Sequence, residues 1–173
     1  VAAAAGLLAV ELAITGALIV PAAGAGARAV AGWLAAEVAV YAAHVAMHRL
    51  PWLWRFHRLH HDGAPLAWAT AWRSHPVDVL LFALAIAGAS AAVGGGLPAA
   101  AWFVLARRAW AVVLHANLAW PPTALDYVIA TPAFHDRHHR EDLPAANFST
   151  TLPILDLVCG TYRRARPVVT RAR

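Results

Sequence analysis

The sequence predicts an all-α integral membrane protein in which about four transmembrane helices form two hairpins beneath a cytosolic, histidine-rich helical cap. Three observations lead to this fold class. Of the 173 residues, 61% are hydrophobic and 13% are charged, whereas a soluble domain usually carries about 25% charged residues. Four apolar stretches have the length of about 18–20 residues that a helix needs to cross a bilayer. All ten histidines fall on the side of these stretches that lies opposite the predicted hairpin tips. Residues 1–173 fit a single domain.

The first element is an apolar stretch that resembles a signal peptide. It lacks a basic leader, contains Glu11 and precedes further apolar stretches, so we interpret it as a membrane span. Segments rich in Gly and Pro, Pro21–Ala27 and Gly94–Pro98, separate the members of each pair of stretches and predict tight hairpin tips. The expected spans are Val1–Val20, Ala29–His48, Pro76–Val93 and Leu97–Leu114.

The distribution of arginine predicts the orientation of these spans. The hairpin tips contain only Arg28, and most other arginines fall on the opposite side, which is cytoplasmic by the positive-inside rule. Arg107 and Arg108 lie within the fourth stretch, so this helix is either shielded inside the bundle or crosses obliquely while both side chains snorkel. The abundance of Ala and the absence of Lys suggest a bacterial gene and hence an inner membrane location. The formal net charge of +5 lies beside apolar spans, so we expect no nucleic acid partner.

Eight of the ten histidines fall into three compact motifs. An HxxxH motif covers residues 44–48, and HxxHH motifs cover residues 57–61 and 135–139. His75 and His115 complete the set, and the predicted topology places all ten histidines on the cytoplasmic side. A lone histidine such as His75 is more often structural than a ligand. The three motifs together are hard to explain in that way.

The spacing within the motifs indicates metal binding. Residues four apart on a helix share one face, with Cβ atoms roughly 5–6 Å apart. His44 and His48 are therefore expected to point at one metal, and each HxxHH motif is expected to offer three imidazoles to a shared site. Neutral imidazole suits Zn, Cu, Fe and Ni. Ten imidazoles exceed the roughly four to six ligands of one ion, so the number of histidines is enough for two ions. The single cysteine, Cys159, excludes a Cys-based site.

Glu37 shares a helical face with Tyr41, His44 and His48. A carboxylate within a membrane span is costly and usually faces the bundle interior or a cavity. Two interpretations remain open: Glu37 either lines a pocket or supports a ligand, or it is an inert buried polar contact.

The order of these motifs is similar to that of the fatty acid hydroxylase / sterol desaturase superfamily. The residues that carry the resemblance run from His44 to Tyr162 and are HVAMHR, WRFHRLHH, WRSHP, His115 with Asn117, TPAFHDRHH, Asn147 and LDLVCGTY. Phe148 and Ser149 stand where the family often has Tyr-Gly, and Leu155 and Cys159 also depart from its pattern. The chain is short for this family and begins at Val1, so we expect N-terminal helices to be missing.

The resemblance implies a membrane-embedded bundle that holds two metal ions, functionally iron, although zinc can replace iron in the purified protein. It implies that Asn117 holds a water or a ligand in place. Asn147 is a further candidate for supporting the ligands, as is Glu37 on the first of its two interpretations. The implied ligands are His44, His48, His57, His60, His61, His115, His135, His138 and His139, with His75 as a weaker candidate.

The expected activity is O2-dependent hydroxylation or desaturation of a C–H bond in a lipid such as a sterol or a fatty acyl chain. No dinucleotide fingerprint is present, so the electrons must come from a separate protein, a ferredoxin or a small haem protein with its reductase. An alternative function with the same kind of oxidation chemistry is that of a carotenoid hydroxylase. Alternatives of other classes are a histidine-rich membrane protein for metal transport or binding, a zinc-dependent membrane hydrolase, and a non-catalytic member of the family.

Overall fold

A computed structural model describes residues 6–13, 26–62, 66–94 and 97–165 of the chain. Across these ranges the protein is helical and contains no strand, which confirms the all-α class. A short N-terminal helix covers residues 6–13. The elements that follow are α2 (Gly26–Arg49), α3 (Pro51–His61), the 3-10 helix η1 (Trp68–Trp72), α4 (Pro76–Ala92), α5 (Leu97–Leu114), the 3-10 helix η2 (Ala124–Tyr127), α6 (Pro132–His138) and α7 (Ile154–Val158).

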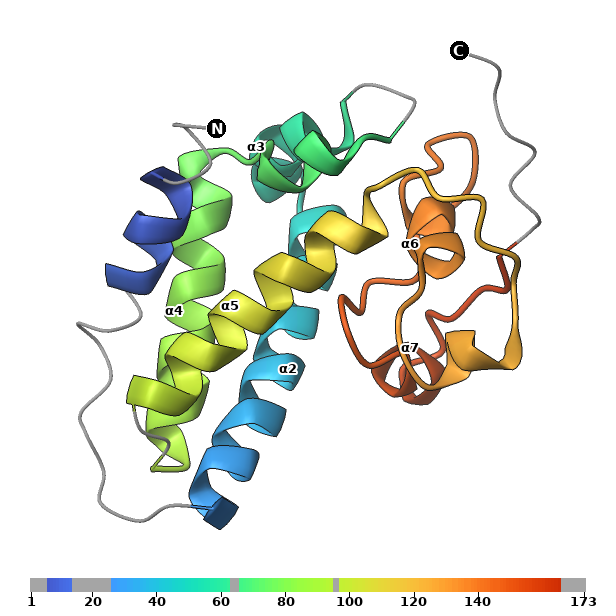
Figure 1. Cartoon of the computed structure of the whole chain (residues 1–173). Helices are drawn as coiled ribbons and strands as arrows, with labels where there is room; N and C mark the ends of the chain where they lie inside the picture. The colour runs from blue at the N-terminus through green and yellow to red at the C-terminus, as the bar shows by residue number, and fades with distance from the viewer. Residues whose placement is uncertain (1–5, 14–25, 63–65, 95–96, 166–173) are drawn as a thin grey trace.

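The three long helices α2, α4 and α5 pack side by side, with the N-terminal helix against α4 and α5 (Figure 1). Small side chains let the helices approach one another closely, as is common in membrane bundles. The aromatic rings of Trp33 and Phe103 meet edge to face, with centroids 5.0 Å apart. The buried core of this bundle consists of Ala36, Val40, Ile86, Ala87, Ala100, Phe103 and Val104.

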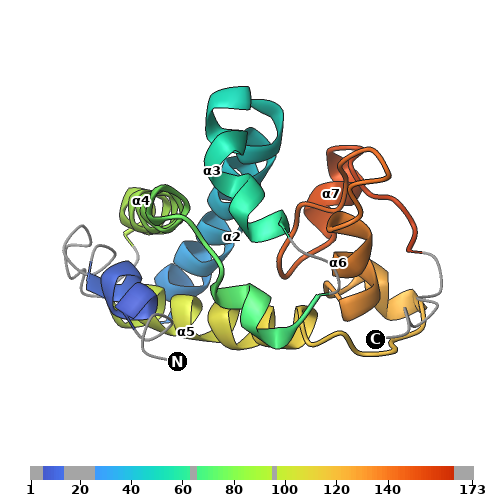
Figure 2. The same ribbon diagram turned by 90° about the horizontal axis from the view of Figure 1, so that it is seen from above.

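The helix α3 and the C-terminal part of the chain, with α6 and α7, form a cap at the ends of α2 and α5 where the histidines occur. Figure 2 shows α3 beside α2, and α6 and α7 grouped together next to it. A second core of Leu114, Ala130 and Phe134 joins α5 to the cap. The indole Nε1–H of Trp110 donates to the carbonyl of Ala130 at 2.9 Å. These contacts fix the cap against the bundle.

Local sequence explains where the cap helices begin. Pro51, Pro76 and Pro132 occupy the first turns of α3, α4 and α6, where the fixed backbone of proline suits a helix and its missing N–H costs nothing. The hydroxyl of Thr131 caps α6 by accepting from the backbone N–H of Phe134 at 3.2 Å. The first turn of α6, which precedes the second HxxHH motif, is therefore set by local chemistry.

In the described part of the chain one helix, α2, is long and apolar enough to cross a membrane, and α4 is a shorter apolar helix. The bounds of α4 and α5 agree closely with the predicted third and fourth spans. Much of the predicted first span, most of the Pro21–Ala27 tip and part of the second tip lie outside the described residues. The arrangement with four spans stays a prediction.

The two arginines of α5 are shielded inside the bundle, which answers the question that the sequence left open. Arg107 and Arg108 are 6% and 7% exposed, and Glu11 of the N-terminal helix is fully buried between them. Arg107 Nη2 and Arg108 Nε each donate to the Glu11 carboxylate at 2.6 Å. The guanidinium of Arg107 also lies over the ring of Phe82, 4.9 Å from its centroid.

We expect the Glu11→Gln variant to lose about 3 kcal/mol of stability, because removing one partner of a buried ion pair leaves an uncompensated charge. Thermal unfolding in mild detergent measures the loss. Glu141→Gln is the matched control, since Glu141 is exposed and makes no ion pair with a described residue. Equal unfolding temperatures for the two variants would show that the buried ion pairs do not hold the N-terminal helix in place.

Candidate metal centre

Four parts of the chain bring their histidines to one place between the bundle and the cap. The last two turns of α2 supply the HxxxH motif, and the last two turns of α3 supply the first HxxHH motif. A histidine directly follows α5, and the second HxxHH motif lies on α6 and its C-cap. Nine of the ten histidines meet in this way: His44, His48, His57, His60, His61, His115, His135, His138 and His139.

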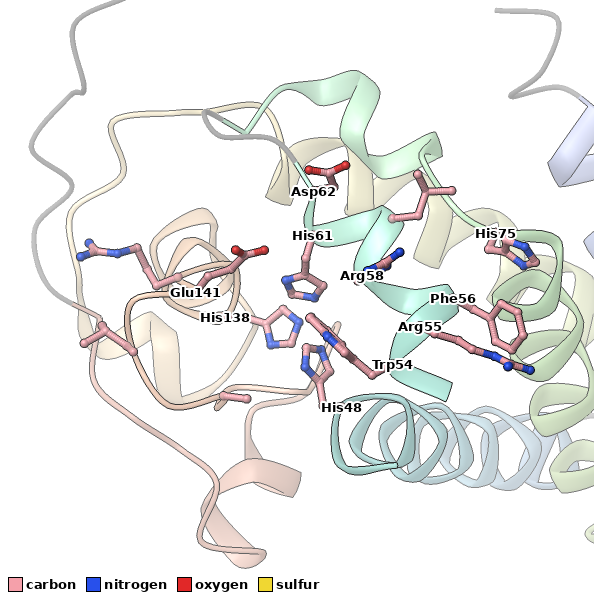
Figure 3. Close-up of a pocket in the computed structure, with 14 residues that line it drawn as sticks. His48, Trp54, Arg55, Phe56, Arg58, His61, Asp62, His75, His138 and Glu141 are labelled. Carbon is pink, nitrogen blue, oxygen red and sulfur yellow. The ribbon is translucent and has the colours of Figure 1, made fainter. Parts of the chain in front are cut away.

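These histidines form two separate groups, and within each group the potential ligand atoms all lie within 4.8 Å of one another. Figure 3 shows His48, His61 and His138 of the first group pointing toward one another. The first group is His44, His48, His57, His61 and His138, and the second group is His60, His115, His135 and His139.

The HxxHH motifs do not each serve one site, and this part of the sequence prediction was wrong. On α3, His57 and His61 belong to the first group, whereas His60 belongs to the second. The second motif divides in the complementary way, since only His138 joins the first group. The reason is helical geometry: residues four apart share a face, but adjacent residues point about 100° apart. Each motif therefore contributes to both groups.

In the first group, backbone carbonyls fix the orientation of two rings. His44 Nδ1 lies 2.6 Å from the carbonyl oxygen of Phe148, and His138 Nδ1 lies 2.8 Å from that of Ala146. A carbonyl can only accept a hydrogen bond, so each Nδ1 carries the proton. Each Nε2 is then left with a lone pair, which is the arrangement of a metal-binding histidine.

The second group repeats this arrangement. His115 Nδ1 lies 2.6 Å from the carbonyl of Ala111, and His60 Nδ1 lies 3.2 Å from the carbonyl of Arg73. The Nε2 atoms of both rings are therefore unprotonated. These two Nε2 atoms lie only 3.2 Å apart, although neither can donate to the other.

The Nε2 atoms crowd together throughout both groups. His115 Nε2 lies 3.0 Å from His135 Nε2 and 3.2 Å from His139 Nε2. In the first group, the Nε2 atoms of His48, His61 and His138 are buried without a hydrogen-bond partner. Converging lone pairs repel one another unless a cation lies between them. The donor set, imidazole nitrogen alone, suits iron or zinc, so the residues fit one metal ion per group.

Burial keeps the imidazoles of the cap in their neutral form. Desolvation, together with the charges of neighbouring histidines, lowers the pKa of His57, His60 and His61 below its usual value. Burial lowers the pKa of His115 to about 4. The same cause lowers the pKa of the three histidines of the second HxxHH motif. At neutral pH these rings are therefore ready to bind a metal without first losing a proton.

Two acidic residues that the sequence analysis did not select support the ligands. Asp156 is fully buried, and its carboxylate accepts from the backbone N–H groups of Phe148 and Ser149, both at 2.8 Å. It thereby holds the carbonyl of Phe148 in place beside His44. Asp78 of α4 lies 3.5 Å from His57 Nδ1. The position of Asp156 in the LDLVCGTY block was the one sequence signal that pointed to it.

Asn147 supports the site indirectly. It is fully buried and has a positive φ of 59°, which asparagine tolerates better than most residues. Its Nδ2 donates to the carbonyls of Phe134 at 3.1 Å and Arg163 at 2.9 Å, and its Oδ1 accepts from the N–H of Arg163 at 2.7 Å. Asn147 therefore ties α6 to the C-terminal segment.

The other two supporting candidates lie outside both groups. Asn117 is exposed and has a φ of 52°, so it shapes the turn after α5. Glu37 is buried at 3% exposure, and its Oε1 has no hydrogen-bond partner. Neither residue belongs to a histidine group.

His75 is the one predicted ligand that the structure places apart. Its Nδ1 accepts from the backbone N–H of Val77 at 3.2 Å and so caps α4. Its ring lies beside Phe56, with centroids 4.7 Å apart, and Figure 3 shows it away from the other histidines. Because its unprotonated nitrogen, Nδ1, already accepts a hydrogen bond as a helix cap, we leave His75 out of the ligand set.

A cavity of about 870 Å³ opens next to the first group. His48, His61 and His138 form one part of its wall, beside Trp54 of α3 (Figure 3). No member of the second group lines it. A small molecule in this cavity would therefore meet the first metal position and not the second.

A helical bundle that gathers nine histidines into two groups that could each hold a metal ion, one of them beside an open cavity, defines a protein of the histidine-motif type. Residues 29–161 match the model of the fatty acid hydroxylase family. The chain belongs to this family, as the order of its motifs indicated. No solved structure matches it.

Curated relatives carry names from the same superfamily. The chain is 31% identical to an ornithine lipid hydroxylase of Rhizobium tropici over 138 residues, covering 78% of this chain and 41% of that protein. It is 34% identical to a very-long-chain aldehyde decarbonylase of rice, Oryza sativa, covering 73% of this chain and 22% of the relative. It is 30% identical to a Dictyostelium discoideum protein described as a methylsterol monooxygenase, covering 70% of this chain and 45% of that protein. The chain thus spans less than half the length of each of these relatives.

We expect the Asp156→Asn variant to bind the first metal about 10- to 100-fold more weakly, because residues that orient a ligand typically contribute this much to affinity. Anaerobic titration of the metal-free protein with ferrous iron, against a competing chelator, measures both affinities. Asp142→Asn is the matched control, since Asp142 is exposed.

The second group should keep its affinity in the Asp156→Asn variant, which separates a local effect from general unfolding. Wild-type affinity at both positions would contradict the role given to Asp156.

Proposed function

We propose that this chain is the catalytic core of a membrane oxygenase that uses two iron ions, dioxygen and external electrons to oxidise a C–H bond of a lipid. The observation that carries the proposal is the division of nine histidines, six of them buried and three half-buried, into two groups, of which one faces a cavity. Family membership supports the same chemistry.

The metal ligands follow from the two groups. One ion would be held by His44, His48, His57, His61 and His138, and the other by His60, His115, His135 and His139. Iron, when bound, supplies the activation of dioxygen that neither protein side chains nor zinc can provide. Zinc would fit the same nitrogens in a purified sample, so zinc content alone does not argue against an iron enzyme.

The protein's own residues orient the metal-binding rings, bind the substrate and exclude water from the site. The carbonyls of Phe148 and Ala146 hold two rings of the first group at fixed angles, which preorganises the site. A lipid bound in the cavity would have a carbon beside His48, His61 and His138, which line it. Burial of the second group keeps bulk water away from it.

The overall reaction balances as follows. One oxygen atom of O2 enters the C–H bond to give an alcohol, and the other leaves as water after taking up two electrons and two protons. Loss of two hydrogens from adjacent carbons, with both oxygen atoms reduced to water, would instead give a double bond. A ferredoxin or a small haem protein with its reductase would supply the electrons.

We place the chain in a bacterial inner membrane with the histidine groups on the cytoplasmic side. The apolar helix α2 supports one span, and α4, α5 and the first apolar stretch would complete two hairpins. The arginine-poor tips favour this orientation. A lipid would then reach the site from the bilayer edge of the cap.

The named relatives support a lipid substrate. An ornithine lipid hydroxylase and a protein described as a methylsterol monooxygenase act on amphiphiles by their names, and an aldehyde decarbonylase acts on a very-long-chain aldehyde. All three names indicate a lipid substrate, but the polar head group of that lipid differs among them. The substrate class of this chain therefore has to come from its own cavity.

Metal transport is the rival of another class. A transport path places its ligands near the membrane midplane, whereas these histidines meet at one end of α2, α3 and α5. Their neutral rings are also held rigidly by carbonyls, which suits a resident metal better than a moving one.

The test uses the full chain, loaded with iron and placed in bilayer discs of bacterial lipid with reduced ferredoxin, ferredoxin reductase and isotopically labelled dioxygen. Mass spectrometry should detect labelled oxygen in a lipid product. We expect His138→Ala to lower this activity by more than about 100-fold, because losing a ligand should cost more than losing a residue that orients one.

The control for metal binding is His75→Asn, which retains a helix-capping side chain and should keep both iron ions. Labelled lipid formed equally well by the His138→Ala variant would refute the proposal, as would an iron-loaded wild type that consumes no oxygen with any lipid.

A further inference from the structure

The cavity beside the first group has charged walls. Arg55 and Arg58 project from α3, Asp62 follows the end of α3, and Glu141 lies on the segment after α6. All four side chains are exposed. A cavity that receives only the middle of a hydrocarbon chain would have no use for these charges.

The four charges do not neutralise one another. Among the residues that the structure describes, none of the four forms an ion pair, and the guanidinium of Arg55 lies instead over the ring of Phe56 at 4.5 Å. Arg140, a further charged residue of the wall, is already paired with Asp142 at 2.6 Å. Two positive and two negative side chains thus line the cavity without an ion-pair partner in the described part of the chain.

The charges stand on different sides of the metal ligands. Figure 3 shows Glu141 on one side of His61 and His138, and Arg58 and Arg55 on the other. On α3, Arg58 lies three residues before His61 and Arg55 three residues before that, so the two arginines stand about 4.5 Å and 9 Å from it along the helix axis. A group bound by Arg58 would therefore lie only a few bonds from a carbon at the first metal position.

We infer that the cavity binds the head of a zwitterionic lipid, with the anionic group at Arg55 and Arg58 and the ammonium group at Glu141, across the metal ligands from both arginines. The carbon that is oxidised then lies in the head or next to it, and not in the middle of an acyl chain. This inference rests on the proposed function for its oxidation step, but its binding step stands alone.

The charge pattern also defines what the site rejects. An uncharged lipid would cover four charged groups without replacing their water, and this desolvation disfavours binding. A lipid with an anionic head alone would satisfy the arginines and leave Glu141 unmatched. Only a head of both signs satisfies both walls.

Binding is tested with three short-chain lipids that share their acyl chains: dihexanoylphosphatidylethanolamine, which is zwitterionic, dihexanoylphosphatidylglycerol, which is anionic, and dihexanoylglycerol, which is uncharged. Calorimetry with the iron-loaded full chain in an uncharged detergent measures each affinity. We expect the zwitterionic lipid to bind at least about tenfold more tightly than the uncharged one, as one charged hydrogen bond would give.

Variants assign the charges to the two walls. Arg55→Gln combined with Arg58→Gln should lower the affinity for both charged lipids by about tenfold or more. Glu141→Gln should lower the affinity for the zwitterionic lipid only. Arg49→Gln is the matched control, because Arg49 is exposed at the end of α2 and does not line the cavity. Equal affinities for all three lipids, or no effect of the double variant beyond that of Arg49→Gln, would overturn the inference.

The position of oxidation separates this inference from the proposed function. Fragmentation of the labelled product should place the new oxygen on the head or its adjacent carbons, and an oxygen in the middle of an acyl chain would overturn the inference while leaving the oxygenase intact. Charge-selective binding with no oxidation of any lipid would instead refute the proposed function and leave the head-binding site standing.

Discussion

The structure depends on one constraint: neutral imidazoles are held so that their unprotonated nitrogens face one another. Carbonyls of Phe148, Ala146, Ala111 and Arg73 accept from the Nδ1–H of four rings. This leaves the Nε2 lone pairs of His60 and His115 facing each other at 3.2 Å, and other Nε2 atoms of both groups also lie about 3 Å apart. On the proposed function, a cation in each group would relieve this repulsion, and metal binding would then be coupled to packing of the cap. The ends of α2 and α3, His115 after α5, and α6 with its C-cap meet at this point.

The cap is as much a part of the metal centre as the histidines. The segment that supplies two of the orienting carbonyls has no regular secondary structure and is held by Asp156 and Asn147. Thr161 links the same carboxylate to the bundle, since its hydroxyl donates to Asp156 at 2.6 Å and lies 2.8 Å from the Tyr41 hydroxyl of α2. A hydrogen-bonded path therefore runs from the bundle through the cap to His44. On the proposed function, this rigidity fixes the metals while the cavity beside them adapts to one kind of lipid head.

The sequence predicted what depends on local pattern. Apolar length located α4 and α5, helical spacing identified eight of the nine histidines that meet, and motif order indicated the family and, through it, His115. It could not predict features that depend on distant contacts. Glu11 is 96 residues from Arg107, so their ion pair leaves no local signal, and Asp156 acts through a backbone N–H. Which histidines of the two HxxHH motifs meet in one group required the relative placement of α3 and α6. The capping role of His75 is a local contact with Val77 that the sequence analysis did not consider.

Anomalous X-ray scattering at the iron edge, on crystals of the full chain loaded anaerobically, tests the two-metal account most directly. The account predicts two peaks, one enclosed by His44, His48, His57, His61 and His138, and the other by His60, His115, His135 and His139. A single peak shared by both groups, or a peak at His75, would contradict it.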